Sequence, residues 1–137
     1  MVEINDRKLP VGIQSFEEIR KGGYLYVDKT DIIWQLANKG KTYNYLIRPR
    51  RFGKSVLVDT LEAYFMGKKE LFEGLKIMQM ETEWVKRPVI RLDMSRAGAE
   101  PETLRSYLDN TFDRLEKEYG ITPKTTAKLA DRFDAII

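Results

Sequence analysis

The sequence contains no cysteine and no histidine among its 137 residues. The lack of cysteine excludes disulfides, thiolate zinc sites and cysteine nucleophiles. The lack of histidine excludes serine–histidine triads, histidine metal sites and the usual general base at neutral pH. Any bound metal ion must therefore have oxygen ligands, which is the preference of magnesium.

Long apolar runs are also missing. The first ten residues have no apolar core of the kind found in a signal peptide, and no stretch approaches the length of a transmembrane helix. These absences predict a cytoplasmic protein without a membrane partner. The 24 basic and 21 acidic residues leave a net charge of only +3. That balance fits an anionic ligand but falls short of the strongly basic surface of a nucleic-acid-binding domain.

The length and the 42% hydrophobic content fit one globular domain over residues 1–137. Apolar residues recur at helical spacing, and capping residues or glycines mark the ends of most of these segments. Helices are therefore predicted over residues 15–22, 28–40, 54–67, 100–120 and 124–137. Runs rich in β-formers predict strands over residues 42–47 and 88–95.

The order of these elements predicts an α/β fold class. Strand and helix alternate from residue 42 onward, which is typical of parallel strands joined by crossover helices. The expected architecture is a partial P-loop NTPase core preceded by an N-terminal helical lead-in. The apolar end at residues 134–137 carries no helix-stop signal, so we expect the chain to be cut short before a further strand and to self-associate through exposed apolar surface.

A basic loop lies between the first predicted strand and the next helix. The window R-P-R-R-F-G-K-S, residues 48–55, matches the phosphate-loop pattern G-x-x-x-x-G-K-[ST] at its last three positions but has Arg48 in place of the first glycine. Gly53 allows the backbone to approach phosphates closely, Lys54 can reach the terminal phosphates, and Ser55 can offer its hydroxyl to magnesium.

The loop therefore predicts an ATP site with Mg²⁺, in which Ser55 is the metal ligand. The first glycine mainly eases the turn, so its replacement removes no group that contacts the ligand. The predicted nucleotide-binding residues of the loop are Arg48, Pro49, Arg50, Arg51, Phe52, Gly53, Lys54, Ser55 and Val56.

Two other interpretations remain open for the loop. It can be a basic turn that leads into a helix, or it can bind nucleic acid or a protein partner through Arg50 and Arg51 without using nucleotide. A separate, acidic candidate is Asp93, which follows the apolar run at residues 89–92 as a Walker B aspartate would, although Arg91 interrupts that run.

The blocks "PVGIQSFEEIRKGGYLYVDKT", "YLIRPRRFGKSVLVDTLEAYF", "LFEGLKI" and "RPVIRLDMS" resemble the AAA-ATPase-like family of bacterial P-loop ATPases. The similarity runs from about Leu9 to the end of the chain. It implies that an arginine in the first glycine's place is a family feature. It also implies that Gly53, Lys54 and Ser55 form the nucleotide-binding core, and that Tyr26 and Asp28 lie beside the nucleotide base.

Members of this family usually continue into an acidic Walker B strand, and many carry a C-terminal domain similar to PD-(D/E)xK nucleases. The resemblance therefore implies that this chain is an N-terminal part, that hydrolysis depends on a segment it lacks, and that nucleic acid is bound through the missing C-terminal domain. The segment that contains Tyr26 and Asp28 also has a local interpretation. Its aspartate at position 28 and threonine at position 30 are good capping residues for the helix that follows.

Overall fold

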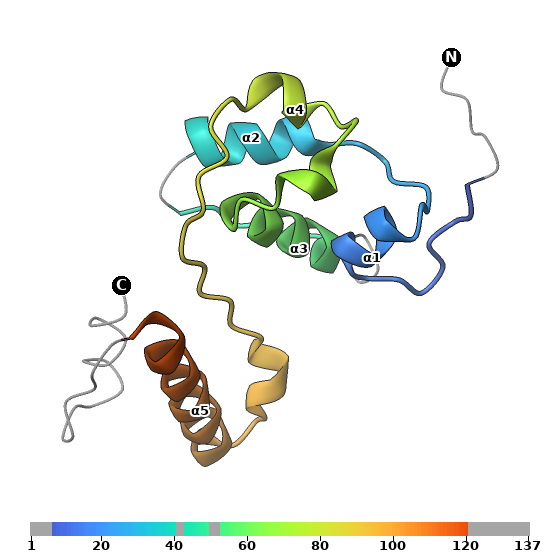
Figure 1. Ribbon diagram of the computed structural model, residues 1–137. Helices are drawn as coiled ribbons and strands as arrows, with labels where there is room; N and C mark the ends of the chain where they lie inside the picture. Colours follow the sequence, from blue (N-terminus) through green and yellow to red (C-terminus); the bar gives the residue numbers. More distant parts are fainter. Residues whose placement is uncertain (1–6, 41–42, 50–52, 121–137) are drawn as a thin grey trace. The chain divides into compact units, whose positions relative to one another are not determined.

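The computed structural model describes residues 7–40, 43–49 and 53–120, in which all regular elements are helices. The chain divides into two compact units, Met1–Val89 and Ile90–Ile137. Helices α1 to α4 belong to the first unit and α5 belongs to the second (Figure 1).

The predicted α/β core of parallel strands is wrong, because no residue in the described ranges lies in a β-strand. The segment predicted as the first strand, 42–47, has Tyr43 and Tyr45 about nine-tenths exposed, at 89% and 90%. A strand needs a neighbouring strand to pair its backbone N–H and C=O groups, and β-propensity reflects how well a side chain fits a sheet surface. The described part of the chain offers no such neighbour, so strand-forming residues alone do not make a strand here.

Two short helices open the first unit and confirm the predictions for residues 15–22 and 28–40. Helix α1 spans Phe16–Lys21 and α2 spans Thr30–Lys39. Ser15 caps α1, because its hydroxyl accepts a hydrogen bond from the Glu18 N–H at 3.3 Å. These helix starts are encoded locally, by a few consecutive residues.

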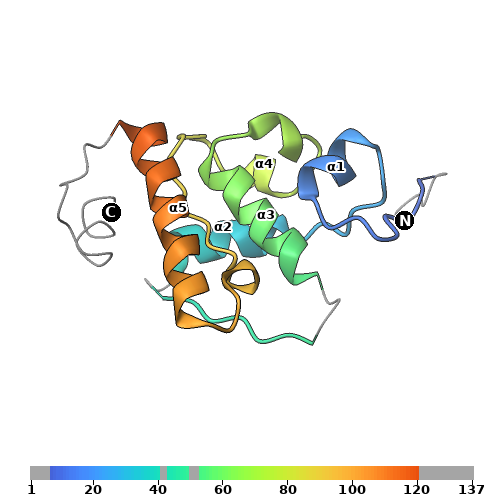
Figure 2. The ribbon, with the colours of Figure 1, turned by 90° about the horizontal axis from the view of Figure 1, so that it is seen from below.

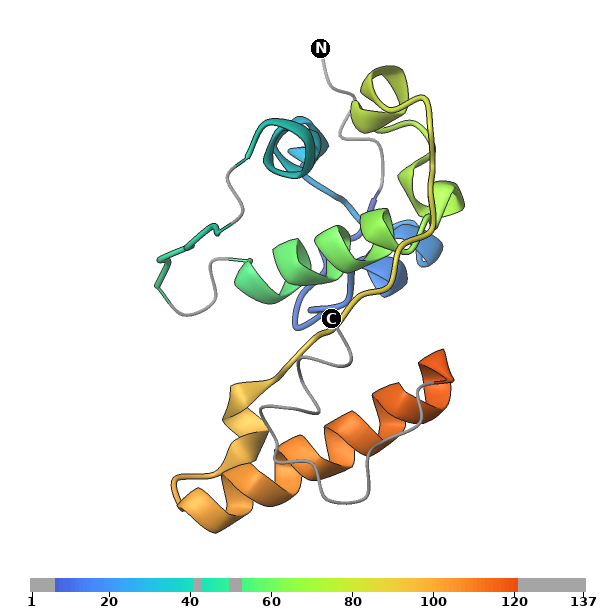
Figure 3. The same cartoon turned by 90° about the vertical axis from the view of Figure 1, so that its left-hand side faces the viewer.

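Helix α3, Lys54–Phe65, confirms the helix predicted over residues 54–67. It packs against α1 and against the 3₁₀ helix η1, Lys69–Phe72, as Figure 2 shows from below. Helix α4, Ile77–Met80, packs instead against α2. Figure 3 shows α3 along its length, with the chain that follows α4 passing its C-terminal end. There the Arg87 N–H donates to the Phe65 carbonyl at 2.7 Å.

Aromatic rings hold the core of the first unit together. Phe16 and Phe72 are fully buried, and their ring centroids lie 5.1 Å apart. Trp84 lies at the same centroid distance from Phe72, 5.1 Å. Buried rings at such spacings contribute both area and directional contacts to stability. The buried core cluster consists of Phe16, Ile33, Ala63, Leu71, Phe72, Leu75 and Ile77.

The second unit contains the 3₁₀ helix η2, Met94–Ala97, and the long helix α5, Pro101–Tyr119. Helix α5 confirms the helix predicted over residues 100–120, with proline in its first turn and Gly120 at its end. The strand predicted over residues 88–95 is wrong, since η2 occupies part of it. Asp93 caps η2 by accepting the Ser95 N–H at 3.1 Å. The helix predicted over residues 124–137 lies outside the described residues.

Candidate functional site

Helix α3 begins directly after a glycine in an unusual backbone conformation. Gly53 adopts the left-handed conformation, with φ 77° and ψ 17°, immediately before the first helical residue. A side chain with a Cβ rarely takes this conformation, so glycine suits the position for a backbone reason. The helical ladder begins here, because the Leu57 N–H donates to the Gly53 carbonyl at 3.0 Å.

The electrostatics of this helix start favour an anion. The first N–H groups of any helix have no intrahelical acceptor and carry a partial positive charge. In α3 the capping residue makes no side-chain hydrogen bond and the first turn contains no acidic residue. Helix α1 differs on both counts, since Ser15 caps it and Glu17 and Glu18 lie in its first turn. The start of α3 therefore lacks the side-chain neutralisation that α1 has.

Three residues of the loop motif are exposed at this helix start: Gly53, Lys54 and Ser55. The next residue, Val56, is half-buried and packs against the core cluster. The side chains that would touch a ligand thus lie in solvent, while the helix that carries them is fixed to the core one residue later.

Further along α3, two polar contacts fix the helix to its surroundings. The Asp59 Oδ2 atom accepts the Phe16 N–H at 3.2 Å, which joins α3 to the start of α1. The hydroxyl of the buried Thr60 donates to the Val56 carbonyl at 2.6 Å, one turn back. A helix held in this way can present its N-terminal groups with little reorganisation.

The upstream half of the loop is described only at Arg48 and Pro49. Both are exposed and lie in neither a helix nor a strand. Arg50, Arg51 and Phe52 lie outside the described residues. The prediction that they help to bind nucleotide therefore remains a prediction.

Ser55 is the one predicted metal ligand. Its hydroxyl is exposed in the first turn of α3, so it is open to a cation held by a bound phosphate. Magnesium prefers hard oxygen ligands and commonly combines one or two protein oxygens with phosphate oxygens and water, so this residue fits the ion. The described residues contain no cluster of three or more acidic side chains placed to hold a metal.

Tyr26, predicted beside the nucleotide base, packs in the first unit. Its ring meets the Phe16 ring edge to face, with centroids 5.2 Å apart. Burial raises the pKa of the Tyr26 hydroxyl, and a hydrogen bond with Thr60 acts in the opposite direction. The aromatic body of Tyr26 thus supports the core, and its contact with a base remains a prediction.

Asp28, the other residue predicted beside the base, joins two segments far apart in the sequence. Its Oδ1 atom accepts the Thr30 N–H at 3.0 Å and the Thr30 hydroxyl at 2.6 Å. Its Oδ2 atom accepts the Lys76 N–H at 2.7 Å. Partial burial opposes ionisation, but these hydrogen bonds together outweigh it and hold the pKa of Asp28 below its usual value. Asp28 thus binds the N–H of the first residue of α2, although the capping position itself is Lys29, which makes no side-chain cap hydrogen bond.

Thr30 extends this connection and was not singled out by sequence reasoning except as a cap. It is fully buried, and its hydroxyl accepts the Ile77 N–H at 3.1 Å. The start of α2 is therefore tied to the start of α4 through both Asp28 and Thr30. Only the polar pair at positions 28 and 30 was visible in the sequence, because the partner N–H groups belong to the backbone of a distant segment.

Comparisons with known proteins define the family. The model of the AAA-ATPase-like family, described as predicted AAA-ATPase, matches residues 10–137. The chain therefore belongs to this family. The arginine in the place of the first loop glycine does not prevent membership, since the match includes the loop.

One relative is an uncharacterized protein in the vnfD 5′ region of Azotobacter chroococcum mcd 1. The two proteins are 49% identical over 88 residues, which is 63% of this chain and 17% of the relative. The aligned stretch thus spans less than a fifth of that relative's length. No solved structure matches the chain. None of the helices in the described ranges combines the length and apolar character needed to cross a membrane.

Proposed function

We propose that the chain binds the phosphates of ATP at the N-terminus of α3. The observation that carries the proposal is the left-handed Gly53 directly before an exposed Lys54 and Ser55, at a helix start without an acidic first turn. Helix N-termini of this kind bind anions through free N–H groups and the helix dipole. Membership of the predicted AAA-ATPase family supports a nucleotide as the source of the phosphate.

Each residue has a defined role in this proposal. The backbone N–H groups of Lys54, Ser55 and Val56 donate to phosphate oxygens, and the Lys54 ammonium neutralises charge on the terminal phosphates. The Ser55 hydroxyl is a ligand of Mg²⁺. The bound ion supplies charge neutralisation at the phosphates. The proposal concerns binding, and hydrolysis would require an acidic helper that has not been assigned.

The test is a calorimetric titration of ATP with Mg²⁺ into the 137-residue chain and two lysine variants. Loss of a charge-assisted contact corresponds to about 1.5–3 kcal/mol, so Lys54→Ala should weaken binding by about 10- to 150-fold. Lys69→Ala removes another exposed lysine, from η1, and should leave the affinity unchanged. Equal affinities of the parent and Lys54→Ala would refute the proposal.

A parallel titration with DNA tests the alternative, a basic module that binds nucleic acid. If the loop binds nucleic acid instead, the chain should bind a DNA duplex with an affinity that falls steeply with salt and does not depend on ATP.

We further propose a cytoplasmic location and a single AAA-ATPase-like domain over residues 1–137. Self-association, and nucleic acid binding through a further domain, remain predictions about partners.

A further inference from the structure

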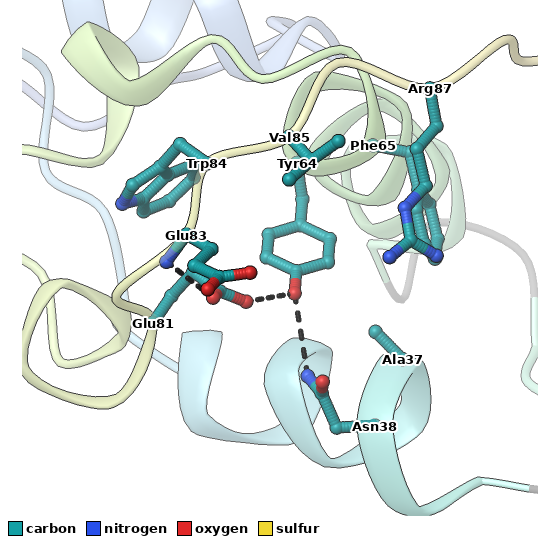
Figure 4. A pocket seen from close by; sticks show the side chains of 9 residues that line it. All are labelled: Ala37, Asn38, Tyr64, Phe65, Glu81, Glu83, Trp84, Val85 and Arg87. Carbon is teal, nitrogen blue, oxygen red and sulfur yellow. Dashed lines mark hydrogen bonds between the residues drawn. The ribbon is translucent and has the colours of Figure 1, made fainter.

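A pocket lies at the other end of α3. This pocket of about 120 Å³ lies among the C-terminal ends of α2 and α3 and the chain at residues 81–87 (Figure 4). With a rise of about 1.5 Å per residue, Tyr64 lies about 15 Å along the helix axis from Lys54, so the pocket is separate from the proposed phosphate site. Its lining residues are Ala37, Asn38, Tyr64, Phe65, Glu81, Glu83, Trp84, Val85 and Arg87.

Hydrogen bonds fix the polar wall of this pocket. The Tyr64 hydroxyl donates to the Glu81 Oε2 atom and accepts from the Asn38 Nδ2 atom, the latter at 3.3 Å (Figure 4). The Glu81 Oε1 atom accepts the Glu83 N–H at 3.0 Å. Burial raises the pKa of the Tyr64 hydroxyl, and its hydrogen bond to Glu81 acts in the same direction. Tyr64 therefore remains a neutral donor and holds the Glu81 carboxylate in place.

The charges in the pocket are not balanced locally. Figure 4 shows the side chains of Glu81 and Glu83 on one side of the Tyr64 ring and the Arg87 guanidinium on the other. Within the described ranges, neither glutamate forms an ion pair. The lining therefore carries two carboxylates against one guanidinium, and a bound cation would reduce the remaining negative charge.

Two aromatic rings line the pocket beside these carboxylates. The rings of Tyr64 and Trp84 meet edge to face, with centroids 5.7 Å apart. Trp34, the other tryptophan, has the Lys39 ammonium 5.6 Å from its ring centroid. Among the described residues no cation occupies the corresponding position at Trp84. Tryptophan is the aromatic residue that attracts cations best.

We propose that this pocket binds an alkylguanidinium or alkylammonium group. Glu81 and Glu83 neutralise the cation and Trp84 contacts its apolar stem or its face. The pocket is smaller than the roughly 300–1,000 Å³ of sites for drug-sized ligands. It therefore suits the head group of one arginine or lysine side chain, or a small free amine, and the site goes beyond the proposed nucleotide binding.

The experiment uses Trp84 fluorescence in a Trp34→Phe background, which leaves one tryptophan in the chain. The probes are Nα-acetylarginine amide and ethylguanidinium, with Nα-acetylglutamine amide as the neutral control. We expect a saturable change with both cations, none with the neutral probe, and weaker binding at higher salt. Tighter binding of the arginine amide would indicate a peptide source, and equal binding a free small cation. Absence of a saturable change with either cation would overturn the proposal.

Charge variants test which groups bind the cation. Glu83→Gln should weaken binding about fivefold, whereas Glu70→Gln, a matched exposed glutamate in η1, should not change it. Arg87→Gln should strengthen binding about twofold, because it removes a like charge. Far-ultraviolet circular dichroism of each variant confirms that the fold is retained. Equal affinities of Glu83→Gln and Glu70→Gln, or weaker binding by Arg87→Gln, would contradict the assignment.

Discussion

Replacing Asp28 by asparagine tests the connection between α2 and α4. The substitution keeps the size of the side chain but places an amide where the carboxylate accepts three hydrogen bonds, from the N–H and hydroxyl of Thr30 and the N–H of Lys76. An asparagine can retain the Thr30 contacts through its oxygen. Its NH₂ group then faces the Lys76 N–H, which loses its acceptor.

The expected cost follows from these contacts. A hydrogen bond to a charged group contributes about 1.5–3 kcal/mol, so the loss of the Lys76 contact and of the charge should lower the free energy of unfolding by about 2 kcal/mol at pH 7. Asp31→Asn is the matched control in the first turn of the same helix. It should cost about 0.3–1 kcal/mol, since only the interaction with the helix dipole changes.

The cost should also depend on pH in a defined direction. The pKa of Asp28 is lower in the folded protein, so its carboxylate stabilises the fold above the ordinary aspartate pKa of about 3.9. This stabilisation is lost as the pH falls through the lower folded pKa. Urea unfolding, followed by circular dichroism between pH 7 and pH 3, should show the parent and Asp28→Asn converging at low pH. A cost at pH 7 no larger than that of Asp31→Asn would refute the reasoning.

Gly53→Ala should lower the free energy of unfolding by about 1–2 kcal/mol, because the left-handed conformation is unfavourable for alanine. Gly74→Ala is its matched control, with φ 78° against 77° and no heavy atom within 4 Å of an added Cβ at either position. Thermal melts should show similar losses of stability for both variants. Only Gly53→Ala should also weaken the binding of ATP with Mg²⁺. Equal affinities of the two variants for ATP would contradict the role of Gly53. Phe72→Ala should cost about 3–5 kcal/mol in urea unfolding, since the side chain is fully buried, and a cost below about 1 kcal/mol would contradict its place in the core.

The helices could be predicted from the sequence because their signals are local. Ser15 before α1, Pro101 in the first turn of α5 and Gly120 after it are each next to the element they delimit. The predicted strands failed for the opposite reason. The run at residues 43–47 has the right residue types, but a strand depends on a partner elsewhere in the chain, which residue types do not reveal.

The two candidate sites differ in the same way: one is encoded locally and the other depends on distant segments. The phosphate-binding motif lies within a few consecutive residues, so Gly53, Lys54 and Ser55 could be recognised from the sequence. The pocket at Tyr64 depends on contacts with Asn38, which is 26 residues away, and with Glu81, 17 residues away. Nothing in the local sequence around Tyr64 indicates that its hydroxyl meets a carboxylate from a distant segment.

The most direct test of the proposed phosphate site is amide NMR of the ¹⁵N-labelled chain during titration with ATP and Mg²⁺. The account predicts that the largest shifts occur at the N–H groups of Lys54, Ser55 and Val56, because these groups would donate to the phosphate oxygens. Small shifts at these three amides, with saturable shifts elsewhere or none at all, would contradict it.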